Sequence, residues 1–125
     1  MKLRLFIFST ALSCSFSSFG QTYTGNDLLR DMSAGNDVQK AFAMGFVVGA
    51  SEAIRSVIDA QRMSNEQRKG LLPTYCPPSP GIPRMQMVDI VKKHLIDNPA
   101  SRHEIAESQV YGAVLQAFPC PIGPR

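Results

Sequence analysis

The sequence of 125 residues contains no tryptophan and only three cysteines, and it lacks the residue patterns of the common catalytic and metal sites. It has no Gly-x-Ser-x-Gly, no His-Glu-x-x-His, no glycine-rich phosphate loop, and neither Cys-x-x-Cys nor His-x-x-x-His spacing. The two histidines, His94 and His103, read best as surface or capping residues, with pH sensing as the alternative. We therefore predict no enzyme, no metal site and no cofactor.

Extended alternation of apolar and polar residues is also missing, so no strand is predicted. The net charge of +3 is small, and Arg62, Arg68 and Lys69 are too sparse to form a nucleic-acid-binding stripe. The sequence consequently predicts an all-α fold of four to five helices that does not bind nucleic acid.

The N-terminus has the three parts of an export signal. A basic start precedes the apolar run Leu5–Leu12, which is too short for a membrane span of roughly 20 residues. Small residues stand three and one positions before the bond between Gly20 and Gln21, where we predict cleavage. Residues 1–20 are thus a predicted signal peptide and 21–125 a single domain. The mature chain would carry 11 basic and 10 acidic residues, a net charge of +1.

Cys14 leaves one alternative for the export signal. Ser13 is the small residue that a lipoprotein signal places before its cysteine, but Ala11 stands where that signal usually has an aliphatic residue. Lipidation at Cys14 is therefore the less favoured reading. In either case Cys14 does not join the cysteines of the domain, and the predicted location is the periplasm.

Apolar residues at steps of three and four predict helices at 27–32, 37–62, 84–97 and 101–117, with a short helical turn at 64–69. We predict that a capping box formed by Ser101 and Glu104 begins the last helix. Asn98-Pro99 and Pro119 mark the ends of the last two helices.

Small residues repeat every four positions at Gly45, Gly49 and Ala53 in the longest helix. Each mid-helix glycine costs about 1 kcal/mol relative to alanine, which indicates that the row serves close helix packing. The neighbour is either another helix of the same chain or a second subunit. The surrounding apolar stretch, Ala41–Ala50, is too short to span a membrane.

Cys76 and Cys120 flank the last two predicted helices, whose antiparallel packing would bring both cysteines to one end. A disulfide between them would close the 43 residues from 77 to 119 and stabilise the fold by on the order of 4 kcal/mol in the idealised entropy model. A nucleophilic Cys76, a redox pair and a metal site are the alternatives, but no histidine is placed near Cys76 by the sequence.

The connection before the third helix is long and rich in proline. Such long irregular connections are uncommon in compact domains and are often functional. Leu71, Leu72 and Tyr75 are its candidate partner contacts, because apolar and aromatic residues anchor interfaces. The alternative is that these side chains fold back as a lid on the core.

Several motifs together resemble the Rap/Tai family. Gly45–Ala53 resembles the Gly-Tyr-Ile-x-Gly-Val-x-Asp-Ala helix of that family, although Phe46 replaces the tyrosine and Glu52 the aspartate. Family members often have a second cysteine pair, at positions that correspond here to Met32 and Ala43. The likeness continues through Cys76-Pro77, Gln86–Leu95, Asn98-Pro99, Arg102-His103, Ala106 and Ala117–Cys120.

This resemblance implies a helical periplasmic protein, often a homodimer, that binds a type VI-secreted peptidoglycan amidase and blocks its active site. Such amidases use a cysteine–histidine mechanism, whereas the immunity protein performs no chemistry. The alternative function is a general periplasmic helical binding or stress-related module without a dedicated toxin, because a fold does not fix a function.

Overall fold

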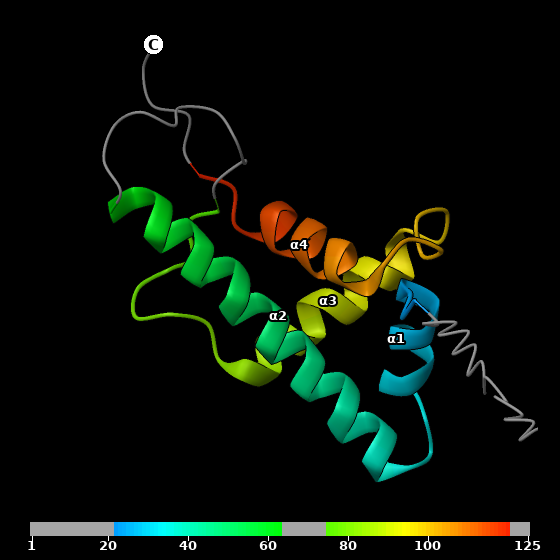
Figure 1. Ribbon diagram of the computed structural model, residues 1–125. Helices are drawn as coiled ribbons and strands as arrows, with labels where there is room; N and C mark the ends of the chain where they lie inside the picture. The colour runs from blue at the N-terminus through cyan, green and yellow to red at the C-terminus, as the bar shows by residue number, and fades with distance from the viewer. Residues whose placement is uncertain (1–21, 64–74, 121–125) are drawn as a thin grey trace, which may run out of the picture.

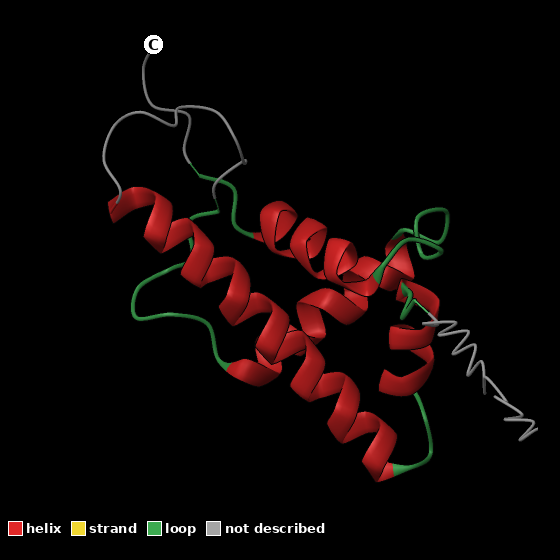
Figure 2. Cartoon of the chain, viewed as in Figure 1, coloured by secondary structure: helices red, strands yellow, loops and turns green. Residues whose placement is uncertain are grey.

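The computed structural model describes residues 22–63 and 75–120, which form a bundle of four helices. These are α1 (Gly25–Met32), α2 (Asp37–Met63), α3 (Arg84–Asp97) and α4 (Ala106–Ala117) (Figure 1). The described residues contain no strand, only two isolated bridges between extended segments (Figure 2). The predicted all-α fold is confirmed, and the predicted short turn at 64–69 lies outside the described residues.

The core lies where all four helices meet, with α2 running the length of the molecule beside the other three (Figure 1). Each helix contributes apolar side chains to this core. The largest side chains that are fully buried are Leu28, Val47, Val91, Leu95, Val110 and Val114.

Only one side of α2 contributes to this core. Ala43, Val47 and Ile58 are buried at helical spacing, and Ser51 among them donates its hydroxyl to the carbonyl of Val48 at 2.9 Å. The opposite side faces outward. By length and composition the stretch Asp37–Ala60 could also cross a membrane, and 22% of an apolar 18-residue window within it is buried. Its buried stripe shows that here it serves as the central helix of the bundle.

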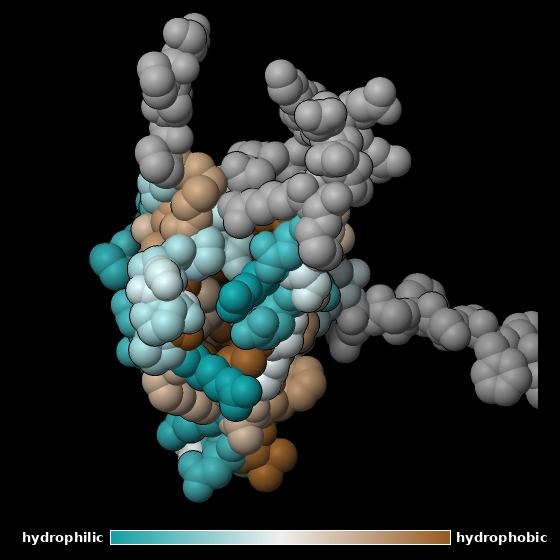
Figure 3. Space-filling model, turned by 90° about the vertical axis from the view of Figure 1, so that its left-hand side faces the viewer, coloured by the Kyte–Doolittle hydropathy of each residue, from teal (hydrophilic) through white to brown (hydrophobic). Residues whose placement is uncertain are grey.

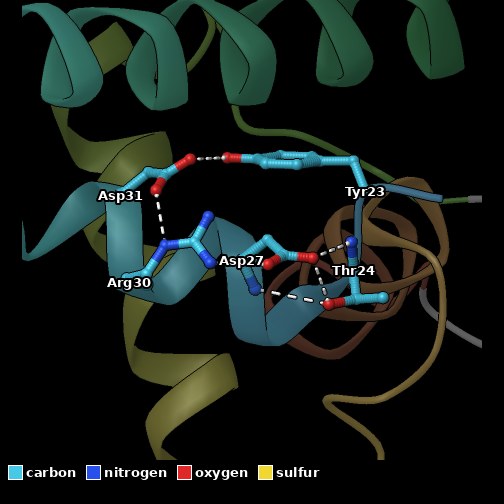
Figure 4. A network of polar contacts seen from close by, with 5 residues as sticks. All are labelled: Tyr23, Thr24, Asp27, Arg30 and Asp31. Carbon is cyan, nitrogen blue, oxygen red and sulfur yellow. Dashed lines mark hydrogen bonds and ion pairs between the residues drawn. The ribbon is translucent and has the colours of Figure 1, made fainter. Parts of the chain in front are cut away.

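The start of α1 is held by a capping box formed by Thr24 and Asp27. The amide of Asp27 donates to the hydroxyl of Thr24, whose own amide and hydroxyl donate to the Asp27 carboxylate at 3.0 and 2.7 Å (Figure 4). Arg30 bridges Asp27 and Asp31, and Asp31 accepts the Tyr23 hydroxyl at 2.9 Å. This network fixes residues 23–24 against α1 as an extended segment.

The capping box predicted for Ser101 and Glu104 is wrong, because α4 begins at Ala106. Residues 101–104 form a turn, and Ile105 is extended and bridges Thr24. The segments are joined by the amide of Gly25 donating to the Glu104 carbonyl at 3.0 Å and that of Ala106 donating to the Tyr23 carbonyl at 2.9 Å. These long-range hydrogen bonds outweigh the local helical preference of residues 101–105.

Ser101 has a different role from the predicted cap. Its hydroxyl donates to the side-chain oxygen of Gln109 at 3.2 Å, and the Gln109 amide donates back to the Ser101 carbonyl at 3.0 Å. Gln109 is buried, so this pairing satisfies a polar group that would otherwise be costly inside the core.

Gly25 lies at the tightest approach between α1 and its neighbours. A Cβ atom there would come within 2.9 Å of Gln109 Cγ, 3.0 Å of Leu95 Cδ2 and 3.1 Å of the Arg102 carbonyl oxygen. We expect Gly25→Ala to lower the free energy of unfolding by about 1–3 kcal/mol, as overpacking does. Urea unfolding of wild type and variant measures this difference in the free energy of unfolding. The control is Gly35→Ala, because a Cβ at Gly35 meets no described atom within 4 Å. Equal stability of the two variants would contradict this packing.

Acid should weaken the α1 cap. The hydrogen bonds from the Thr24 side chain, and then from its amide, hold the pKa of Asp27 below its ordinary value of 3.8. A lowered folded pKa gives stability that is present above pH 3.8 and is lost as the pH falls through the folded pKa. We expect Thr24→Ala to remove part of this acid dependence and to cost about 1 kcal/mol near neutral pH. Thermal unfolding of both proteins between pH 2 and 7 tests this, and identical pH profiles would contradict it.

Candidate partner-binding site

Cys76 and Cys120 form a disulfide whose Cα atoms are 4.8 Å apart, so the pairing predicted from the sequence is confirmed. Beside it, Tyr75 bridges Pro119, and the amide of Cys76 donates to the Phe118 carbonyl at 2.9 Å. The entrance of the connection to α3 is thereby joined to the end of α4. Because its sulfur is bonded, Cys76 carries no thiolate, and the alternative of a nucleophilic Cys76 fails.

From the disulfide the chain passes into the segment 76–83, which we call the proline loop. Prolines occupy half of its positions and restrict its backbone. Gly81 has a φ of 130°, a conformation that side chains with a Cβ rarely adopt. With the disulfide at one end and α3 at the other, the proline loop is held at both ends, so little ordering entropy would be lost when it binds.

A small hollow of about 40 Å³ lies between the proline loop and the flank of α2. Figure 3 shows one side of the molecule, where hydrophilic surface surrounds a hollow that contains hydrophobic atoms. Arg55 and Arg84 both line the hollow beside the proline loop. Arg55 is paired with Asp59 at 3.7 Å, both about half exposed, so this ion pair is weak. The other lining residues are Val48, Ser51, Glu52, Tyr75, Pro77, Gly81, Ile82 and Met87.

Tyr75 was predicted to contact a partner, but the structure places its side chain in the core. Only 3% of it is exposed, which matches the alternative of a side chain folded back on the core. The main-chain pairing with Pro119 explains this, because it turns the chain inward beside the disulfide. Leu71 and Leu72, the other predicted contacts, lie outside the described residues.

Gly45, Gly49 and Ala53 are all exposed, on the outer side of α2. A Cβ atom placed on Gly45 or Gly49 would meet no described atom within 4 Å. No described helix of the same chain therefore packs against the row. Of the two neighbours that the sequence left open, the intramolecular one is not found within residues 22–63 and 75–120.

Both histidines hold local structure. His94 on α3 lies 2.9 Å from the Gln116 side-chain oxygen on α4, and a Cβ atom placed on Gly112 would come within 3.4 Å of its ring. His103 bonds the Ala100 carbonyl within the turn before α4. In the described part of the chain no three His, Cys, Asp or Glu side chains are grouped so that they could hold a metal ion.

Sequence reasoning missed Arg55 and Arg84 as possible site residues. They are 29 positions apart, and the hollow exists only once α2 and the proline loop pack together. One available signal was the position of Arg84, a cation in the first turn of a helix, where the helix dipole disfavours positive charge.

The fold and these surfaces define a small helical protein, closed by a disulfide, that offers a stiff loop and a charged hollow for binding. The model of the Rap1a immunity proteins matches residues 24–120, most of the chain, which therefore belongs to this family. Membership indicates an immunity protein whose partner is a protein toxin, and such proteins are generally not catalytic. No curated protein and no solved structure matches the chain.

Removing the disulfide should destabilise the fold strongly. For Cys76→Ser with Cys120→Ser we expect the free energy of unfolding to fall by about 2–4 kcal/mol, because the unfolded chain regains the freedom of a long loop. Denaturant unfolding measures the loss, with oxidised and reduced wild-type protein as the comparison. A difference below about 0.5 kcal/mol, the range of ordinary surface substitutions, would contradict the structural role of the bond.

Proposed function

We propose that the protein is a periplasmic immunity protein that binds a type VI-secreted peptidoglycan amidase and sterically blocks its active site. The observation that carries this proposal is the family match over residues 24–120. The disulfide supports an oxidising compartment, which agrees with the signal peptide predicted at residues 1–20. Two further parts of the proposal, the amidase as the partner and the homodimer, rest on the resemblance to the Rap/Tai family seen in the sequence.

The proline loop and the adjoining hollow are the surface that we propose meets the toxin. A loop fixed at both ends can enter a cleft without first being ordered, so its contacts are not offset by ordering entropy. Two of the three charged residues that line the hollow, Arg55 and Arg84, are basic and the third, Glu52, is acidic, and this small excess of positive charge favours an acidic or carboxylate-bearing segment on the toxin. Leu71 and Leu72 remain proposed contacts, whereas the buried Tyr75 supports the loop from below.

The second candidate function is a general periplasmic helical module without a dedicated toxin. The exposed apolar side chains on α2 favour it, because such surfaces can also bind unrelated clients. That module would bind many proteins weakly, whereas an immunity protein binds one toxin in a fixed ratio.

Capture with oxidised residues 21–125 separates the two functions. Exposed to periplasmic and type VI-secreted proteins, the bait should retain one cysteine-type amidase at a fixed ratio. The purified amidase should then lose its activity on peptidoglycan when one equivalent of bait is added. A mixture of weakly held proteins, or capture without inhibition, would contradict the immunity function.

Charge reversal tests the binding surface. We expect Arg55→Glu and Arg84→Glu each to weaken toxin binding by roughly 10- to 100-fold, because they replace attraction by repulsion at the rim. Titration calorimetry with the captured amidase measures the affinity. Lys92→Glu on α3, which makes the same change of charge outside the hollow, is the control. Equal losses in all three variants would indicate a general charge effect and would remove the hollow from the interface.

A further inference from the structure

The Cys76–Cys120 disulfide lies where the proposed binding surface joins the bundle. It ties the start of the proline loop to the end of α4, and from there the loop runs beside α2 to the start of α3 (Figure 1). Both cysteines are partly exposed rather than enclosed in the core, so a thiol from solvent can approach the bond. The oxidation state of this pair can therefore respond to the surroundings of the protein.

The core of the bundle is formed by contacts that do not involve the cysteines. Each of the four helices contributes a side chain that is fully buried: Leu28, Val47, Leu95 and Val110. At the start of α4, residues 23–25 pair with residues 104–106 by hydrogen bonds. The loss of stability that removal of a disulfide usually causes is smaller than the net stability of a typical domain. We therefore expect the reduced chain to keep its four helices.

The proline loop depends on the bond more directly than the core does. Residues 78–80, in the middle of the loop, are exposed, so the position of the loop is set from its two ends. Breaking the bond leaves the first end to non-covalent contacts, such as the hydrogen bond of 2.9 Å from the Cys76 amide to the Phe118 carbonyl. Water competes for both groups of such a bond, so its net contribution is modest.

The shape of the hollow follows the position of this loop. Pro77, Gly81 and Ile82 line the hollow from the loop, and Arg84 lines it from the first turn of α3. The opposite wall comes from α2, whose buried stripe fixes it in the bundle. A shift of the loop therefore moves one wall against the other and changes a hollow of only about 40 Å³. The surface proposed to meet the toxin is complete only while the loop is held.

We propose that the Cys76–Cys120 pair is a redox switch for toxin binding. In the oxidised protein the bond holds the proline loop and the hollow in their binding arrangement. In the reduced protein the four helices remain, but the loop is released, and ordering it again on binding weakens the affinity at least about 100-fold. The proposal rests on the proposed function and adds a means of regulating the same site.

The bond forms by thiol–disulfide exchange with an oxidant that carries a disulfide of its own. One cysteine thiolate attacks a sulfur of the oxidant, forms a mixed disulfide and expels a thiolate. The second cysteine thiolate then attacks the protein sulfur of the mixed disulfide, which closes the Cys76–Cys120 bond and releases the second thiolate of the oxidant. Two electrons pass to the oxidant, and the two protons of the protein thiols end on its two sulfurs. A dithiol reverses both steps.

Such a switch would couple toxin binding to export. Cytosolic thiols keep cysteine pairs reduced, whereas the periplasm oxidises them. A precursor that still carries the predicted signal peptide would therefore bind the toxin weakly, and the exported chain would gain its affinity when the bond forms.

Nitrogen-15 NMR relaxation tests the release of the loop without any toxin. Residues 21–125 are compared in the oxidised state and after reduction with dithiothreitol. We expect the backbone order parameters of Ser79 and Gly81 to fall from about 0.85 to below about 0.6 on reduction, the values of rigid and flexible backbone. Those of α2 and α3 should not change, and circular dichroism should show the same helical content. Unchanged order parameters in the loop, or loss of the helices, would overturn the switch.

Titration calorimetry with the captured amidase tests the effect on binding. Reduced wild-type protein, with the reductant removed before mixing, and the variant Cys76→Ser with Cys120→Ser should each bind at least about 100-fold more weakly than oxidised protein. Reoxidation should restore the affinity of the wild type but not that of the variant. The control is Gly25→Ala, which destabilises the bundle away from the loop and should leave the affinity unchanged. A similar loss of affinity in this control would attribute the effect to stability and overturn the switch.

Failure of the switch and failure of the proposed function give different results. If the oxidised protein captures no amidase, the proposed function is wrong, and the redox control of toxin binding is wrong with it. If oxidised and reduced protein bind and inhibit the amidase equally, the switch alone is wrong and the immunity function stands.

Discussion

The Cys76–Cys120 disulfide joins the start of the proline loop to the end of α4, and the positions of several other parts follow from it. It aligns Tyr75 with Pro119, and this pairing buries the Tyr75 side chain in the core. The proline loop then has a fixed origin, and its restricted backbone carries that constraint as far as α3. A domain with a modest core thus holds an exposed loop in place by a covalent bond.

A second constraint acts at the other end of the molecule and consists of hydrogen bonds. Residues 23–25 pair with residues 104–106, while the capping box and the Asp31–Tyr23 bond hold the same segment against α1. Burial and the neighbouring Asp31 carboxylate raise the pKa of Tyr23 above its ordinary value, so its hydroxyl stays protonated and can donate to Asp31. Both ends of α4 are therefore tied to extended segments distant in sequence.

The features that depend on neighbouring residues in the sequence could be predicted from it. The extents of α2 and α3 follow from apolar periodicity and from proline, and the disulfide follows from the antiparallel order of the last two helices. The start of α4 was predicted wrongly because the competing partner of residues 104–106 lies some 80 positions away. For the same reason the hollow beside Arg55 and Arg84 could not be predicted, and Tyr75 could not be assigned to the core.

The geometry of α2 separates two surfaces of the molecule. Successive residues of a helix are about 100° apart, so Glu52 and Arg55 fall on one flank and Ala53 and Val57 on the other. The first flank borders the hollow, and the second borders an open apolar groove that Tyr111 of α4 also lines. The part of α2 that is proposed to meet the toxin is therefore confined to the flank beside the proline loop.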